Sequence, residues 1–199
     1  MKKLLRYLSF VPAIVMLLFI FRFSAQDGPT SGSLSYRVCC VLLSFWERLF
    51  SLELSSGEFA SRAESMQFFV RKAAHITEYF FLTFFIFLPL RVWLPQKTDA
   101  ETKKLFLLRY LLPTFLLTVI CAGADEFHQS FVPGRCGTPK DVLVDSVGII
   151  LSCSAILLGH HLKACGIKMR FPFLHKRHLS PDCHKSHKQK KGSYDVFLL

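Results

Sequence analysis

The stretch Leu105–Gln129, LFLLRYLLPTFLLTVICAGADEFHQ, decides the fold. Its first part, Leu105–Ala124, is mostly apolar and has the length that an α-helix needs to cross a hydrocarbon core of about 30 Å. Its last residues are ionisable or polar, and include Asp125, Glu126, His128 and Gln129. A helix satisfies its own backbone hydrogen bonds in lipid, so we expect this stretch to span a membrane with a polar end.

Three other stretches have a similar length and apolar character. The composition of the whole chain agrees with several membrane spans, because 51% of its 199 residues are hydrophobic and 21 are Phe. The predicted spans are Leu4–Phe23, Ala73–Leu94, Leu105–Ala124 and Val142–Leu162. Val38–Leu54 is also apolar, but it is short and charged at its middle, which indicates an interfacial or re-entrant helix. The predicted fold class is therefore an all-α, polytopic bundle of four transmembrane helices with this additional helix in its first extracytoplasmic loop.

The net charge of +11 is unevenly distributed along the chain. The segment 163–199 contains nine Lys or Arg residues and two acidic ones, so we predict a basic, His-rich and flexible tail after a membrane domain that covers residues 1–162. This distribution argues against nucleic acid as a partner. Basic residues also flank the first span and the link between the second and third spans, and the positive-inside rule then predicts that both termini are cytoplasmic.

Local signals predict where the helices begin and end. The Gly-, Pro- and Ser-rich segment Ser24–Ser33 predicts a loop, and Ser61–Glu64 has the pattern of a capping box that starts the second membrane helix. Thr138 as cap, with Pro139 and Asp141 in the first turn, predicts the start of the fourth. The seven Cys residues lie in different predicted compartments, which argues against a disulfide framework and leaves the role of Cys39 and Cys40 open.

Ionisable residues gather at span ends that the predicted topology brings to the extracytoplasmic side. Charge inside a bilayer is costly unless it is paired or hydrated, so these residues form a candidate functional cluster. Asp141, Asp145, Gly148 and Ser152 also follow one another at helical spacing, and this stripe should face the centre of the bundle. The candidate residues are Ser24, Gln26, Arg71, Lys72, His75, Glu78, Tyr79, Asp125, Glu126, His128, Gln129, Arg135, Asp141 and Asp145.

Several of these residues stand in motifs that resemble the VanZ-like family of membrane proteins. The motifs are FSAQ at 23–26, RKAAHITEY at 71–79 and DEFHQSFVPGR at 125–135, followed by Asp141, Val142, Asp145 and Gly148. They occur in the family's order across nearly all of Leu4–Leu162. The resemblance implies a small four-helix protein of the bacterial cell membrane, from a family named for a member that contributes low-level resistance to the lipoglycopeptide teicoplanin.

The main functional hypothesis is a pocket on the extracytoplasmic face that recognises an envelope lipid or lipid-linked compound and thereby lowers susceptibility to glycopeptide or lipopeptide antibiotics. Lys72, His75 and Arg135 would supply cations, and the carboxylates would accept hydrogen bonds or protons. A purely structural ion-pair network that joins the helices is a serious competitor. A third hypothesis is a non-enzymatic partner of another envelope protein.

Two chemical alternatives remain open. An enzyme acting on a lipid headgroup could use His128 as nucleophile or base and Arg135 to bind phosphate. A metal could be held by His75-x-x-Glu78 and Asp125-x-x-His128, but this pattern is incomplete and nearby Lys and Arg would repel a cation, so no metal ligand is predicted. The sequence does not identify a cofactor. The tail residues His175, His178, Cys183, His184 and His187 are better explained as part of a solvated basic segment.

Overall fold

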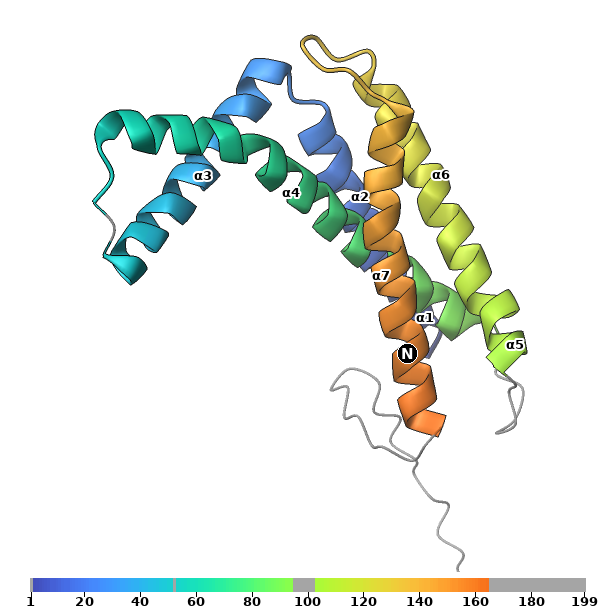
Figure 1. Cartoon of the computed structure of the whole chain (residues 1–199). Helices are drawn as coiled ribbons and strands as arrows, with labels where there is room; N and C mark the ends of the chain where they lie inside the picture. The colour runs from blue at the N-terminus through green and yellow to red at the C-terminus, as the bar shows by residue number, and fades with distance from the viewer. Residues whose placement is uncertain (1, 52, 95–102, 165–199) are drawn as a thin grey trace, which may run out of the picture.

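The computed structural model describes residues 2–51, 53–94 and 103–164, and every regular element among them is a helix. This confirms the predicted all-α fold class. Figure 1 shows the arrangement of the helices. In chain order they are α1 (Lys2–Leu8), α2 (Val11–Ser24), α3 (Gly28–Phe50), α4 (Ser56–Trp93), α5 (Lys103–Phe106), the π-helical turn η1 (Leu107–Leu111), α6 (Leu112–Gln129) and α7 (Pro139–Ala164).

Four helical stretches are long and apolar enough to cross a membrane, and they correspond to the four predicted spans. The first of them is interrupted by a turn at residues 9–10, between α1 and α2. They are Arg6–Ser24, Ser56–Trp93, Lys103–Gln129 and Pro139–Lys163. The predicted tail lies almost entirely in residues 165–199, outside the described residues.

The outer surface of the bundle is apolar, as a lipid-facing surface should be. On α6, Leu116, Leu117 and Ile120 are exposed, and α7 exposes residues such as Leu143, Ile150 and Leu158. Because lipid is as apolar as these side chains, burial of apolar surface cannot by itself hold the helices together. Close packing and polar contacts must contribute a larger share.

The core lies where α2, α4, α6 and α7 meet, around Ile20, Tyr79, Leu82, Ala122 and Ile149. The crossing of α4 and α7 is especially close. A Cβ atom on Gly148 would collide with the carbonyl oxygen of Ile76 and would lie only 3.1 Å from the backbone nitrogen of Phe80.

The stripe predicted on α7 is turned towards this interior. Asp145 and Ser152 are almost fully buried, Gly148 is buried, and Asp141 is half-buried. Since small residues allow helix backbones to approach in a membrane, Gly148 explains how α7 packs against α4.

The structure corrects two predicted helix starts. The segment Ser24–Ser33 is not a continuous loop, because Asp27 caps α3: its Oδ1 accepts a hydrogen bond from the backbone N–H of Thr30 at 2.9 Å. Pro29 occupies the first turn, where its missing N–H costs nothing. The helix predicted at Val38–Leu54 therefore begins ten residues earlier, at Gly28, and ends at Phe50.

The capping box predicted at Ser61–Glu64 is wrong, because the same pattern occurs earlier. The backbone N–H of Ser55 donates to Oε2 of Glu58 at 3.0 Å, and the Ser55 hydroxyl accepts from the backbone N–H of Glu58. Helix α4 therefore starts at Ser56, and Ser61 and Glu64 lie within it. Ser51, the residue that caps the end of α3, has a positive φ of 51°, which turns the chain before Ser55.

Helix α3 and the first half of α4 pack on each other and form an arm that extends from the bundle (Figure 1). Their contact is built around Cys39, Leu43 and Ala63. Large apolar side chains of α3 are exposed, among them Val41, Phe45 and Leu49. This composition agrees with the predicted additional helix that contacts lipid.

Candidate functional site

The last turns of α2 and α6 and the first turns of α7 lie at the same end of the bundle, beside the middle of α4 (Figure 1). We call this the polar end. Most of the candidate residues come together here. We define the polar cluster as Ser24, Lys72, His75, Glu78, Asp125, Glu126, Gln129, Arg135, Asp141 and Asp145.

A hydrogen-bonded group joins α2 to α6 inside the cluster. The hydroxyl of Ser24 donates to Oδ2 of Asp125 at 2.8 Å, and Nε2 of Gln129 donates to the same oxygen at 3.0 Å. Gln129 Nε2 also lies 3.1 Å from the Ser24 hydroxyl oxygen. All three side chains are at most 5% exposed, so this group fixes the relative positions of the two helix ends.

Arg135 lies in the loop between α6 and α7 and ties it to the rest of the polar end. Its Nη1 donates to Oε1 of Gln129 at 3.2 Å, while its Nη2 donates to the hydroxyl of Ser31 at 2.6 Å and to the carbonyl of Phe23 at 3.3 Å. Burial, followed by the neighbouring guanidinium of Arg71, lowers the pKa of Arg135. Because an arginine starts from a pKa above about 12, Arg135 stays cationic at neutral pH.

A second set of contacts joins α4 to α7. Lys72 donates to Oδ1 of Asp141 in a partly exposed ion pair. One turn further along each helix, Nδ1 of His75 lies 3.5 Å from Oδ1 of Asp145, whose side chain is only 1% exposed. The polar residues of α4 thus face those of α7 in register.

Three potential ligand groups meet between α4 and α6. Ligand atoms of His75, Asp125 and Glu126 all lie within 4.8 Å of one another. Glu126 also accepts a hydrogen bond at Oε2 from the backbone N–H of Thr138, at 3.1 Å. Tyr79 lies at the base of the cluster, fully buried and close enough to Asp125 and Asp145 to interact with both electrostatically.

Three of the predicted residues are placed differently from the rest. Arg71 is exposed at the edge of the cluster, and Gln26 is half-buried in the turn between α2 and α3. The ring of His128 packs edge-on against Phe21, with ring centroids 5.6 Å apart. Unlike these three residues, Glu78 belongs to the polar cluster: it is half-buried and close enough to Asp125 and Arg135 for electrostatic interaction.

The sequence analysis did not identify Ser31 or the contact between the two loops. Ser31 is buried as a partner of Arg135, and the backbone N–H of Gly28 donates to the carbonyl of Pro133 at 3.0 Å. A Cβ on Gly28 would collide with the backbone of Gly134, so this contact needs glycine. The Asp-Gly-Pro sequence at 27–29 was the available signal, because it is typical of a helix start that would have brought Ser31 into the first turns of a helix.

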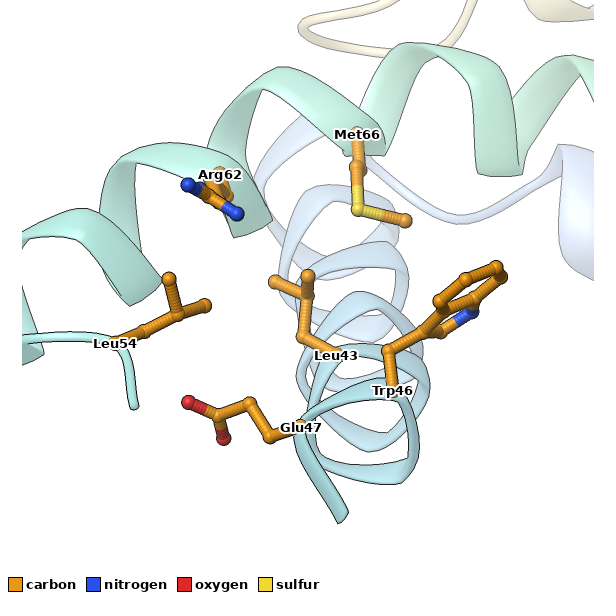
Figure 2. Close-up of a pocket in the computed structure, with 6 residues that line it drawn as sticks. All are labelled: Leu43, Trp46, Glu47, Leu54, Arg62 and Met66. Atoms are coloured by element: carbon orange, nitrogen blue, oxygen red, sulfur yellow. The ribbon is translucent and has the colours of Figure 1, made fainter. Parts of the chain in front are cut away.

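Two cavities among the described residues lie away from the polar cluster. One, of about 220 Å³, opens between α3 and α4, and Figure 2 shows the side chains of Glu47 and Arg62 at its wall together with Leu43, Trp46, Leu54 and Met66. The other, of about 250 Å³, is an apolar hollow between α7 and the stretch from η1 to α6. The predicted headgroup pocket thus stays a prediction.

Comparison with known protein families gives a match over most of the chain. Residues 9–159 match the model of the VanZ/LLP1 family. No curated protein and no solved structure shows a significant match. The family match includes all four spans almost completely and every residue of the polar cluster. The chain is therefore a multi-pass membrane protein that belongs to the VanZ/LLP1 family.

Proposed function

We propose that this protein binds the headgroup of an envelope lipid or lipid-linked compound at its polar end, and that this binding lowers susceptibility to glycopeptide or lipopeptide antibiotics. The polar end faces the outside of the cell in this proposal, with both termini in the cytoplasm. The observation that carries the proposal is the position of two cations, Arg71 and Lys72, at the edge of a buried polar cluster in a membrane-spanning bundle.

The arrangement of charge supports an amphiphilic ligand with phosphate in its headgroup. Arg71 is exposed, so its planar guanidinium can donate two parallel hydrogen bonds to a phosphate, in the geometry that arginine favours. Lys72 is about a quarter exposed despite its contact with Asp141 and adds a second positive charge. Arg135 is less suited to this role, because both of its terminal nitrogens already donate to groups of the protein.

The arm beside the polar end supports the same class of ligand. Apolar side chains of α3 and α4, such as Phe45, Phe68 and Phe69, are exposed and can contact hydrocarbon chains. A headgroup held at Arg71 would therefore lie near an apolar surface suited to the rest of a lipid. We take this combination as support for lipid recognition over a purely structural ion-pair network.

Lipid binding can be tested with the full-length protein purified in a mild detergent. Native mass spectrometry would measure the binding of phosphatidylglycerol and of a polyprenyl phosphate to the wild type and to Arg71→Gln. We expect the bound fraction of at least one of these lipids to fall several-fold in the variant. Expression of the wild type, but not of Arg71→Gln, should reduce the susceptibility of bacteria to teicoplanin.

Arg37→Gln is the matched control, because Arg37 is an exposed arginine of α3 outside the polar cluster. It should bind both lipids as the wild type does. Equal binding by the wild type and Arg71→Gln, with both proteins folded, would contradict the proposal. It would favour the structural network instead.

A further inference from the structure

The polar cluster contains a set of side chains with the chemistry of a metal site. His75 from α4 and Asp125 and Glu126 from α6 place one ligand atom each within 4.8 Å of the others. Asp125 and Glu126 are 1% and 5% exposed, and the side chain of His75 is 15% exposed. A nitrogen and two carboxylates shielded from water form a much more specific arrangement than acidic groups on a surface.

An unsatisfied oxygen inside this set gives independent support. Asp125 uses Oδ2 for its hydrogen bonds to Ser24 and Gln129, whereas its Oδ1 is buried and has no hydrogen-bond partner among the described residues. A buried carboxylate oxygen without a partner costs free energy. A cation bound at Oδ1 would remove that cost.

Asp145 is placed to support His75. Its Oδ1 lies 3.5 Å from Nδ1 of His75, and its Oδ2 is a second buried oxygen without a hydrogen-bond partner in the described part of the chain. Metal-bound histidines usually direct their other ring nitrogen to a carboxylate or carbonyl, which fixes the orientation of the ring. Asp145 is placed to do this for His75.

The basic residues whose charge argues against a metal donate their hydrogen bonds to groups outside the proposed ligand set. Lys72 contacts Asp141, and the terminal nitrogens of Arg135 point to Gln129, Ser31 and the Phe23 carbonyl. Lys72, Arg135 and the neighbouring Arg71 together carry three positive charges. The five carboxylates of the cluster outnumber these three cations, and a bound divalent ion would favour their ionised forms. The carboxylates are Glu78, Asp125, Glu126, Asp141 and Asp145.

We propose that His75, Asp125 and Glu126 bind a divalent first-row transition-metal ion, such as Zn²⁺ or Mn²⁺, with Asp145 as the supporting carboxylate. A histidine ligand favours these ions over Mg²⁺ and Ca²⁺, which prefer oxygen ligands. Of the pairs His75-x-x-Glu78 and Asp125-x-x-His128, only the first residue of each belongs to the proposed site. The third ligand is Glu126. This inference goes beyond lipid recognition and does not depend on it.

Metal binding can be measured directly on the full-length protein in detergent. After removal of metal with a chelator and titration with Zn²⁺ or Mn²⁺, inductively coupled plasma mass spectrometry would count the bound ions. We expect His75→Ala and Glu126→Gln each to bind about one ion per chain fewer than the wild type. Asp145→Asn should keep the site but weaken its affinity by about 10- to 100-fold.

His128→Ala is the matched control, because His128 lies at the same end of α6 but outside the proposed set. Zn²⁺ bound by histidines of the segment 165–199 would be the same in all these proteins, so the difference between them isolates the proposed site. A second measurement is thermal unfolding, in which Zn²⁺ should raise the midpoint of the wild type and of His128→Ala more than that of His75→Ala.

Equal ion counts for the wild type and His75→Ala would overturn the proposal. So would the absence of bound Zn²⁺ and Mn²⁺ from a folded wild type. The result is independent of lipid binding, because no lipid ligand is added and Arg71 is unchanged. Failure of the lipid experiment would therefore leave the metal result standing, and the reverse also holds.

Discussion

The two ends of the bundle are held together by different chemistry. At the polar end, side chains and loops are joined by hydrogen bonds, such as those that Arg135 makes to Gln129 and Ser31. At the opposite end, which we call the aromatic end, ring contacts join the helices. Tyr7 lies edge-on to Trp93 with ring centroids 5.2 Å apart, and Phe106 stacks on His160 at 3.8 Å. The polar contacts require particular atoms in particular places, whereas ring contacts tolerate small shifts.

The difference in charge between the ends is equally clear. Carboxylates are concentrated at the polar end, whereas Arg6, Lys103, Lys104 and Lys163 belong to helix ends on the aromatic side. Arg91 lies there too, with its guanidinium carbon 4.9 Å from the centroid of the Tyr110 ring. The positive-inside rule predicts that the aromatic end faces the cytoplasm, in agreement with the orientation in our proposal.

The largest effect is expected where α7 crosses α4 near the polar end. Gly148→Val would force a side chain against the backbone of Ile76 and Phe80, which cannot move aside as a flexible side chain can. Because overpacking of this kind separates the helices that carry His75 and Asp145, we expect a loss of about 3 kcal/mol in the free energy of unfolding. Unfolding in detergent micelles, followed by circular dichroism, would measure it.

Gly123→Ala is the control for this substitution, because a Cβ on Gly123 would have no neighbour within 4 Å. Alanine is favoured over glycine inside a helix, so this variant should be unchanged or more stable by up to about 1 kcal/mol. Similar stability of Gly148→Val and Gly123→Ala would show that the polar end does not depend on the close approach of α4 and α7.

The four spans could be predicted from the sequence because each depends on a local property, a long apolar stretch with polar residues at its end. The convergence of Asp125 with His75, and of Asp141 with Lys72, followed from the positions of these residues at span ends. The partner of each charge was not predictable, because it depends on helix rotation and loop path. Arg135 shows this limit: its sequence context suggested phosphate binding, yet its terminal nitrogens contact Gln129, Ser31 and a backbone carbonyl.

The helix starts show a different limit. The patterns at Ser55–Glu58 and Ser61–Glu64 are both of the Ser-x-x-Glu type, and only one can be the first turn of α4. The choice depends on where α3 ends, at Phe50 with the left-handed Ser51 as its cap, and on the packing of α3 against Ala63. Local sequence offers candidates for a helix start, and tertiary contacts select among them.

An intermediate effect is expected from Arg135→Met, which keeps much of the side-chain bulk but removes every hydrogen bond of the guanidinium. Gln129 and the buried hydroxyl of Ser31 would each lose a partner. We expect a loss of about 2 kcal/mol in the free energy of unfolding, measured in the same way. Arg37→Met, at an exposed position of α3, should change the free energy by less than about 0.5 kcal/mol. If Arg135→Met and Arg37→Met lost the same free energy of unfolding, the hydrogen bonds of Arg135 would not stabilise the contact between the loops.

The smallest effect is expected at the aromatic end. Tyr7→Leu removes the edge-on contact with Trp93, but Tyr7 is 61% exposed and Phe10 remains near Trp93, with ring centroids 6.0 Å apart. Trp93 also keeps its hydrogen bond to the carbonyl of Arg6 at 3.1 Å. We therefore expect a loss of about 0.5 to 1 kcal/mol in the free energy of unfolding.

Tyr7→Phe is the control, because it keeps the ring, and its free energy of unfolding should match that of the wild type. A loss for Tyr7→Leu larger than that for Arg135→Met would reverse the comparison, because the aromatic end would then be the more specific of the two.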